Sequence, residues 1–331
     1  MDIQFIRQDG RLVIHPDCHT DLVNKPAWPR HALHHRLCRG VYAQEKGAVL
    51  AGDAEFSEKG VCVYRSLLKD DEAQALQRRA DAAISSKRKD ANGDVPATDD
   101  PDNIAEVVDC DDELKSLVTA ALPKILNDQV NADLERYFQS FYRIDVAQIY
   151  RTFPCDKSTV SFLWHRDVAP MAQVHIMVYL TQSGPKAGST SFLDFDQTRK
   201  LARTGYHFPP VVKRTDDIEG VLRDAGHTPS VNRPDLGVGD GVMFASARVL
   251  HKGNLPLENC RDVLLLVLLP SLLPWSKDIE DFGSEYMFIT ESKSTLKTDP
   301  YKPFNPNITE EMPEEMFEDW IRNGELFPPD A

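Results

Sequence analysis

Short apolar runs separated by turn-forming residues dominate the sequence between residues 141 and 271. The runs are rich in Val, Ile, Leu, Phe and Tyr, and clusters of Gly and Pro separate them. Short strands at this density are typical of an antiparallel sandwich or barrel. We therefore expect a mainly β fold with flanking helices. The predicted strands cover residues 144–152, 173–181, 191–193, 241–244 and 262–269.

Two helices are expected ahead of this core. Acidic residues precede a stretch of good helix formers that ends near Ile84, and such residues favour the first turn of a helix. A second helix is predicted from Leu114 to Leu122, where apolar residues recur at spacings of three and four. A short strand is predicted at 61–64. The acidic segment 99–113 is interpreted as a solvated loop and the start of the second helix.

A long polar insertion, residues 194–235, interrupts the predicted strands. Its stretch 199–214 contains no acidic residue, although the chain as a whole is acidic. Two interpretations stay open: a solvated surface loop, or a lid that attracts an anionic substrate. In the second interpretation the candidate substrate-binding residues are Arg199, Arg203 and Arg214.

The two ends of the chain are expected to extend a single domain that spans residues 1–331. His31, His34 and His35 have spacings that would fit metal ligands on one helix face, but a solvated or packing segment is the simpler interpretation. A helix is predicted over 309–323, and its apolar face suits packing or a subunit contact in a homodimer. The expected parts are an N-terminal extension (1–55), a strand-helix collar (56–140), a core (141–271) and a C-terminal extension (272–331).

The composition limits the classes of partner. The formal net charge is −14, which argues against nucleic acid because phosphate contacts need a basic face. The longest wholly apolar run, Val263–Leu269, is far shorter than the roughly 20 residues of a membrane-spanning helix. The beginning of the chain has no apolar signal segment, and the cysteines show no Cys-x-x-Cys pair. We therefore expect a cytoplasmic protein with reduced thiols.

The segment Trp164-His-Arg-Asp167 is the strongest local sign of chemistry. His165 and Asp167 are two residues apart, so on an extended segment they project to the same side. They can offer one imidazole nitrogen and one carboxylate oxygen to a single metal, and His251 is the best candidate for a third ligand. Two histidines and one carboxylate form the ligand set of non-haem Fe(II) oxygenases. His175, inside a predicted strand, is expected to be a packed core histidine.

Arg261 opens the long apolar strand near the end of the core. Burying its guanidinium without a partner would be costly, and its planar fork suits the distal carboxylate of a dicarboxylic acid. The alternative is an arginine at the sheet rim in a structural salt bridge.

Three blocks of sequence, in this order, carry a resemblance to a known family. The first is Phe56–Leu68 with its following helix, the second runs from Trp164 to Phe192, and the third runs from Gly239 to Arg261. In these blocks the chain resembles the phytanoyl-CoA-dioxygenase-like branch of Fe(II)/2-oxoglutarate-dependent oxygenases. The resemblance implies a double-stranded β-helix, or jelly-roll, core of cupin-like form with the metal at its open mouth.

The resemblance also implies particular roles for site residues. It implies Fe(II) held by His165, Asp167 and His251, and 2-oxoglutarate bound to the iron with its far carboxylate on Arg261. Gln148 and Thr152 would also contact the cosubstrate, because they lie on the strand that usually faces it.

The expected function is that of a dioxygenase using Fe(II), 2-oxoglutarate and O2 to hydroxylate an aliphatic C–H bond of a small metabolite or natural-product intermediate, which would be anionic if the insertion binds it. Three alternatives stay open. The same iron centre could catalyse desaturation or cyclisation, or a cupin-like metalloenzyme could use the same ligands without 2-oxoglutarate. The third is a relative that binds a ligand without catalysis. Arg261 argues against the cupin-like enzyme, and the intact ligand set argues against the non-catalytic relative.

Overall fold

The computed structural model of the chain describes residues 5–8, 11–14, 28–47, 55–88, 104–158, 160–167, 172–184, 186–206, 208–209 and 213–288. The helix predicted over 309–323 lies outside the described residues, and so do the side chains of His31 and His34.

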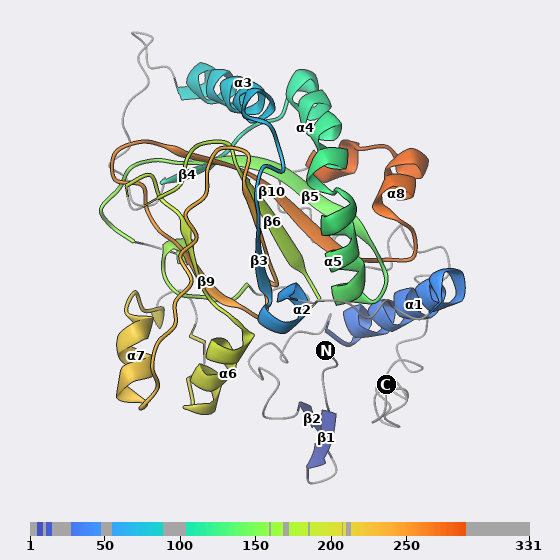
Figure 1. The fold of residues 1–331 in the computed structure, drawn as a ribbon, viewed down its shortest axis with the longest axis vertical. Coiled ribbons are helices and arrows are strands. Elements are labelled where there is room, and N and C mark those ends of the chain that lie inside the picture. Colours follow the sequence, from blue (N-terminus) through green and yellow to red (C-terminus); the bar gives the residue numbers. More distant parts are fainter. Residues whose placement is uncertain are drawn as a thin grey trace.

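A six-stranded antiparallel sheet forms the centre of the molecule (Figure 1). Four of its strands correspond to runs predicted in the core, and a fifth is the short strand predicted at 61–64. The sixth, β4, falls within the acidic segment that was expected to be a loop. Its single pairing, to the end of β5, could not be inferred from local sequence. In sheet order the strands are β3 (Val61–Tyr64), β8 (Gly241–Phe244), β6 (Val174–Tyr179), β10 (Arg261–Ser271), β5 (Phe141–Thr152) and β4 (Ala105–Val107).

A second, smaller pair of strands, β7 (Thr190–Leu193) and β9 (Leu250–Gly253), packs against one face of this sheet. The Tyr179 hydroxyl lies 3.0 Å from Thr190 Oγ1 and so links β6 to β7. Two isolated β-bridges extend this pair of strands. Asn232 pairs with Phe192 on β7, and His165 pairs with His251 on β9. A separate hairpin joins β1 (Phe5–Gln8) to β2 (Arg11–Ile14).

The two faces of β10 are buried to different degrees. Leu264 and Leu266 are fully buried, whereas Leu265 and Val267, which point to the opposite face, keep 8% and 9% of their surface exposed. The second face is the one that meets β7 and β9, because side chains alternate along a strand and Arg261 on that face bonds to Ser189. The interior between the two sets of strands is therefore the place where a site can lie.

Helices surround the six-stranded sheet (Figure 1). The helices predicted near residues 70–84 and 114–122 are present as α3 and α4. The helix α5 was not predicted, although Asn127 caps it by accepting hydrogen bonds of 3.1 Å from two backbone N–H groups of its first turn. The helices are α1 (Trp28–Lys46), α2 (Glu55–Lys59), α3 (Asp70–Arg88), α4 (Asp112–Ile125), α5 (Asp128–Phe138) and α8 (Trp275–Phe282), with 3-10 turns η3 (Val160–Phe162) and η5 (Glu285–Phe288).

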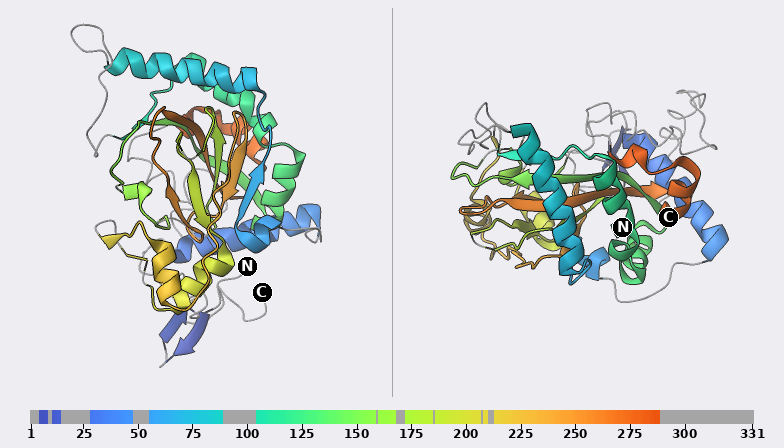
Figure 2. Two further views of the ribbon diagram at one scale, coloured as in Figure 1. Left: turned by 60° about the vertical axis from the view of Figure 1, so that its left-hand side comes forward. Right: turned by 90° about the horizontal axis from the view of Figure 1, so that it is seen from above.

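The insertion 194–235 is more ordered than a solvated loop. It contains two helices, α6 (Phe195–Arg203) and α7 (Ile218–Asp224). Apolar residues from both helices form a small cluster with Trp164 and Leu250, so the insertion packs beside the segment that carries His165. Figures 1 and 2 place α6 and α7 at the end of the molecule opposite to α3.

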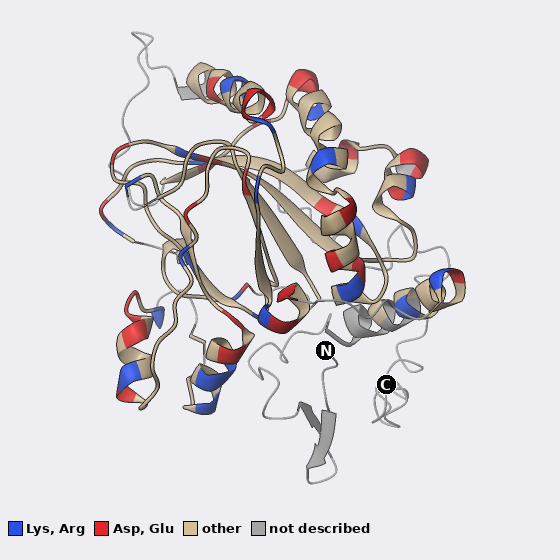
Figure 3. Ribbon diagram, viewed as in Figure 1, with Lys and Arg blue, Asp and Glu red and all other residues tan. Residues whose placement is uncertain are grey.

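Most Lys, Arg, Asp and Glu residues lie on the helices and toward the strand ends (Figure 3). The buried ion pair of Arg143 and Asp145 on β5 is an exception within the sheet. Within the described part of the chain, no helix combines the length and apolar character that a membrane span requires.

Candidate metal centre

His165 and His251 lie opposite each other on neighbouring extended segments. The backbone N–H of His165 donates to the carbonyl oxygen of His251 at 2.9 Å, and the reverse bond measures 2.8 Å. Antiparallel pairing sends two such side chains to the same face, and the ring centroids are 4.4 Å apart. The pairing therefore brings together two residues that are far apart in the sequence.

The backbone also sets which nitrogen of each ring carries its proton. Nδ1 of His165 lies 2.7 Å from the carbonyl oxygen of Leu163, and Nδ1 of His251 lies 2.9 Å from that of Val249. A carbonyl oxygen can only accept, so both Nδ1 atoms hold the proton and both Nε2 atoms keep a free lone pair. This second hydrogen bond is the usual arrangement of metal-ligating histidines.

Asp167 completes the group. Its Oδ1 lies 3.6 Å from Nε2 of His165 and 3.8 Å from Nε2 of His251. Its backbone N–H donates to the carbonyl oxygen of Ser246 at 3.0 Å, which fixes the segment that follows His165. Among the described residues, these three side chains form the one group of at least three potential ligands that could hold a metal ion.

The charge states of these groups suit a cation. Burial lowers the pKa of His165 to about 3, assisted by the charge of His251 and opposed by Asp167. Burial likewise lowers the pKa of His251. Burial alone would raise the pKa of Asp167, but the neighbouring histidines, His251 first, hold it below its ordinary value. Two neutral imidazoles and one carboxylate thus face one point at neutral pH.

Arg261 is buried on the same interior face, with 2% of its surface exposed. Its Nη1 donates to the carbonyl oxygen of Ser189 at 2.8 Å, and its Nη2 donates to Thr152 Oγ1 at 3.2 Å. Its Nε has no hydrogen-bond partner. In the described part of the chain no carboxylate forms an ion pair with Arg261, so the structural salt bridge considered from the sequence is absent there.

The acidic residue next to Arg261 in the sequence, Asp262, pairs with a different arginine. Asp262 is fully buried and accepts two hydrogen bonds from Arg151, to Oδ1 at 2.8 Å and to Oδ2 at 2.7 Å. Arg151 and Asp262 are directly paired across β5 and β10 on the face opposite to Arg261. Gly253 lets the Phe162 ring pack closely on β9, because a Cβ there would lie 2.9 Å from the ring.

Gln148 and Thr152 lie on the face of β5 that Arg261 contacts. Thr152 pairs directly with Arg261, and Gln148 pairs with Leu265, which points into the interior. Between them Tyr150 projects the same way, and burial raises its pKa to about 12. The alternation along β5 thus brings both predicted residues to the interior, together with a tyrosine that the sequence reasoning did not select.

His175 was expected from the sequence to be a packed core histidine, but its ring also faces the Asp167 carboxylate. Its Nδ1 lies 3.6 Å from Asp167 Oδ2, and its Nε2 lies 2.9 Å from Gln173 Nε2. The same Gln173 amide donates to Ser246 Oγ at 3.1 Å, and Ser246 also bonds to Asp167. An amide NH2 that donates to Nε2 leaves the proton on Nδ1, where it faces the carboxylate. No sequence signal identified this group, because it depends on contacts between β6 and the end of β8.

The three arginines of the insertion are placed differently. Arg214 is among the charges that affect the pKa of His165 and of His251, whereas neither Arg199 nor Arg203 is. Arg199 and Arg203 lie on α6, and Arg203 is exposed. Of the three, only Arg214 is followed by a residue bonded to the segment of a candidate ligand, through the Trp164 N–H and the Thr215 carbonyl oxygen.

The N-terminal histidines contribute no described ligand. His35 lies on α1, in a region without predicted regular structure, and its Nε2 lies 2.6 Å from the carbonyl oxygen of Phe138. This contact favours the packing interpretation for His35.

Among the comparisons with known proteins, only the one with solved structures finds similar chains. No protein-family model and no curated protein matches the chain. Solved structures similar to it include the "non-heme alpha ketoglutarate dependent carbocyclase SnoK from nogalamycin biosynthesis" (17% identity over 67% of this chain and 85% of that chain, TM-score 0.45). Another is EctD from S. alaskensis in its apoform (16% identity over 69% of this chain and 81% of that chain, TM-score 0.45). A third is EvdO2 from Micromonospora carbonacea var. aurantiaca complexed with 2-oxoglutarate (16% identity over 68% of this chain and 93% of that chain, TM-score 0.44). At these identities and TM-scores, the chemistry is inferred from the residues of this chain alone.

Proposed function

We propose that this chain is an Fe(II)- and 2-oxoglutarate-dependent oxygenase that hydroxylates an aliphatic C–H bond of a small molecule. The observation that carries the proposal is the placement of His165, Asp167 and His251 on one interior face with an unpaired, buried Arg261. The first three side chains suit Fe(II), and the fourth suits the far carboxylate of a dicarboxylic acid.

The three side chains would hold Fe(II) and would leave the metal accessible to a cosubstrate and O2. Iron with 2-oxoglutarate and O2 supplies the oxidation of an unactivated C–H bond. The Leu163 and Val249 carbonyls hold the imidazoles in the ligating tautomer. His175 and Ser246 hold Asp167 from its other side, so the carboxylate keeps Oδ1 directed at the metal.

Arg261 would bind the far carboxylate of 2-oxoglutarate through its unpaired Nε. The Ser189 carbonyl and the Thr152 hydroxyl fix the guanidinium plane, which leaves the remaining donors oriented before the cosubstrate arrives. A buried donor without an acceptor costs about 1–3 kcal/mol, and this cost is relieved when the carboxylate binds. Thr152 is in this view a positioning residue for Arg261, and Gln148 lies on the same face of β5.

The arrangement of strands supports a jelly-roll interpretation of the fold. The six-stranded sheet would form one wall, and β7, β9 and their two bridged segments would form the other. The metal ligands on the bridged segment and β9, with Arg261 on β10, would then lie between the walls. We interpret the whole chain as one oxygenase domain built around this core.

Hydroxylation is proposed over desaturation or cyclisation because it needs no further group from the protein. A cupin-like enzyme that uses the same metal without 2-oxoglutarate is the second candidate. Arg261 argues against it, because such an enzyme has no use for a buried guanidinium without an acid partner.

An anaerobic titration tests the proposal. Protein mixed with Fe(II) should develop a weak visible charge-transfer band when 2-oxoglutarate is added. The band should be lost in Asp167→Ala and should need much more 2-oxoglutarate in Arg261→Gln. Absence of the band in the unaltered protein would refute the proposal. Metal binding that is indifferent to 2-oxoglutarate would favour the cupin-like alternative.

A further inference from the structure

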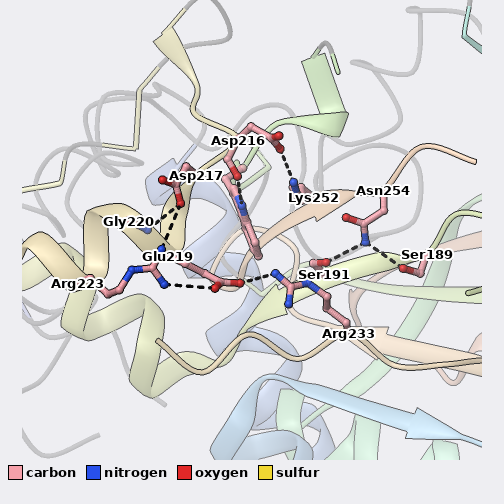
Figure 4. A network of polar contacts seen from close by, with 11 residues as sticks. Ser189, Ser191, Asp216, Asp217, Glu219, Gly220, Arg223, Arg233, Lys252 and Asn254 are labelled. Carbon is pink, nitrogen blue, oxygen red and sulfur yellow. Dashed lines mark hydrogen bonds and ion pairs between the residues drawn. The ribbon is translucent and has the colours of Figure 1, made fainter. Parts of the chain in front are cut away.

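The segment that carries Arg214 is fastened to the candidate metal centre on two sides. The carbonyl oxygen of Thr215 accepts a hydrogen bond of 3.0 Å from the backbone N–H of Trp164, the residue before His165. The carbonyl oxygen of Asp216 accepts one of 3.0 Å from the Trp164 indole. The Asp216 carboxylate pairs with Lys252, the residue after His251 (Figure 4). The position of Arg214 is therefore tied to both histidine-bearing segments.

The charge of the Arg214 side chain acts on the candidate ligands, in addition to the larger effect of their burial. Its positive charge lowers the pKa of His165 and of His251, and the charge of Asp167 acts in turn on Arg214. Even so, no carboxylate in the described part of the chain forms an ion pair with Arg214. The nearby acids Asp216 and Asp217 pair instead with Lys252 and Arg223 (Figure 4).

The hydrogen bonds of Arg214 leave one edge of its guanidinium available. Nη1 donates to the carbonyl oxygen of Val160 at 2.9 Å, and Nε is buried without a partner. The Nε–H and the adjacent Nη2–H are parallel donors that match the two oxygens of a carboxylate. The Tyr206 hydroxyl is also buried without a partner, and it interacts electrostatically with Arg214.

These donors are separate from those assigned to 2-oxoglutarate. Arg261 is held by Thr152 and Ser189 and is almost fully buried, whereas Arg214 is half-buried and belongs to the insertion. One dicarboxylic acid bound to the metal and to Arg261 would leave the Arg214 donors unsatisfied. Their acceptor must therefore come from another molecule, and the one that has to lie beside the metal is the substrate.

We propose that Arg214 and Tyr206 form a carboxylate-binding subsite that orients an acidic substrate beside the metal. The proposal rests on the proposed function and names the substrate class of that same site. A phosphate group offers the same oxygen acceptors, but a dianion calls for more donors than one guanidinium edge and one hydroxyl. A carboxylate is thus the better match.

Fluorine NMR of difluoroacetate tests the subsite directly. The protein is loaded with Mn(II), whose unpaired electrons broaden the signals of nearby nuclei, and with saturating 2-oxoglutarate. Difluoroacetate should then show saturable broadening. Arg214→Gln should weaken its binding by about 10-fold or more, and Tyr206→Phe by a smaller factor, since a charge-assisted contact is stronger than a neutral one. Arg223→Gln, an exposed arginine of the same insertion, is the matched control and should leave binding unchanged.

The outcomes separate this proposal from the function on which it rests. If Mn(II) and 2-oxoglutarate fail to bind to the unaltered protein, the proposed function is wrong. If they bind, also in Arg214→Gln, and the broadening is the same in both proteins, the subsite is wrong. Broadening that disappears as 2-oxoglutarate saturates would place the probe in the cosubstrate position and overturn the subsite. Inorganic phosphate that displaces difluoroacetate at a lower concentration would overturn the choice of a carboxylate.

Discussion

His165 and His251 are oriented by the same backbone arrangement. Each Nδ1 faces the carbonyl oxygen two residues earlier in its own segment, and the two segments are joined by a reciprocal pair of backbone hydrogen bonds. The two Nε2 lone pairs are therefore directed before any metal binds. Of the three candidate ligands, Asp167 is the one that would supply negative charge.

Asp167→Asn should abolish tight metal binding while leaving the fold intact. The amide removes the negative charge that offsets the dehydration of the cation, and it places an NH2 group where an acceptor is needed. We expect Mn(II) affinity, measured by calorimetry, to fall by about 100-fold or more. Asp196→Asn, on the exposed side of α6, is the control. Equal Mn(II) affinity in the Asp167 and Asp196 variants would contradict the assignment.

Two of the three candidate ligands, His165 and Asp167, could be selected from the sequence because their spacing has a direct geometric meaning. A His-x-Asp pair on an extended segment shares one face whatever the rest of the fold does. The sequence did not predict the surroundings of Asp167, because Gln173 and Ser246 meet only through the pairing of β6 with β8. Likewise, composition could mark the insertion as basic, but it could not separate Arg214 from Arg199. That difference arises from the backbone bond between Thr215 and Trp164.

Gln173→Leu should weaken the metal site without removing a ligand. The leucine has similar volume but no donor, so the proton of His175 is no longer fixed on the nitrogen that faces Asp167. Loss of such an outer partner lowers metal affinity by about 10- to 100-fold. Electron paramagnetic resonance of the Mn(II)-loaded protein should show an altered spectrum. A spectrum and an affinity identical to those of the unaltered protein would show that Gln173 only fills space.

Arg261→Gln should separate cosubstrate binding from metal binding. The guanidinium is not a metal ligand, so Mn(II) affinity should stay within about 3-fold. The affinity for 2-oxoglutarate should fall by about 10- to 100-fold, since a hydrogen bond to a charged group contributes about 1.5–3 kcal/mol. Calorimetric titration of 2-oxoglutarate into the Mn(II)-loaded protein measures this change. Arg65→Gln, whose exposed side chain pairs with Asp240, serves as the control, and a matching loss there would argue for an indirect effect.

Arg151→Met should affect stability much more than cosubstrate binding. It removes both hydrogen bonds that the fully buried Asp262 carboxylate accepts from Arg151 and leaves only the longer one, 3.4 Å, from Gln77 Nε2. Breaking a buried pair in this way costs about 3–5 kcal/mol. Asp81 contacts the same guanidinium from a half-exposed position. Asp81→Asn should therefore lower the free energy of unfolding by less than about 1 kcal/mol. Urea unfolding gives both values. A loss below about 1 kcal/mol in Arg151→Met would mean that Asp262 finds another partner.

The stability of the metal-free protein should fall as the pH decreases below about 6.5. Burial holds the pKa of His165, His175 and His251 below their ordinary values. Between the native and unfolded pKa values the unfolded chain binds more protons, so the free energy of unfolding rises with pH in that range. Each histidine contributes up to about 1.4 kcal/mol per pH unit.

Urea unfolding between pH 7 and pH 5 measures this slope before most carboxylates begin to titrate. The double variant His165→Gln/His251→Gln lacks two of the three depressed groups and should show a distinctly flatter dependence. His227 lies in the insertion and is only partly buried, so His227→Gln is the matched control and should keep the slope of the unaltered protein. A slope that is the same in all three proteins would mean that the imidazoles become protonated within the folded state, and that the backbone carbonyls do not keep them as neutral ligands.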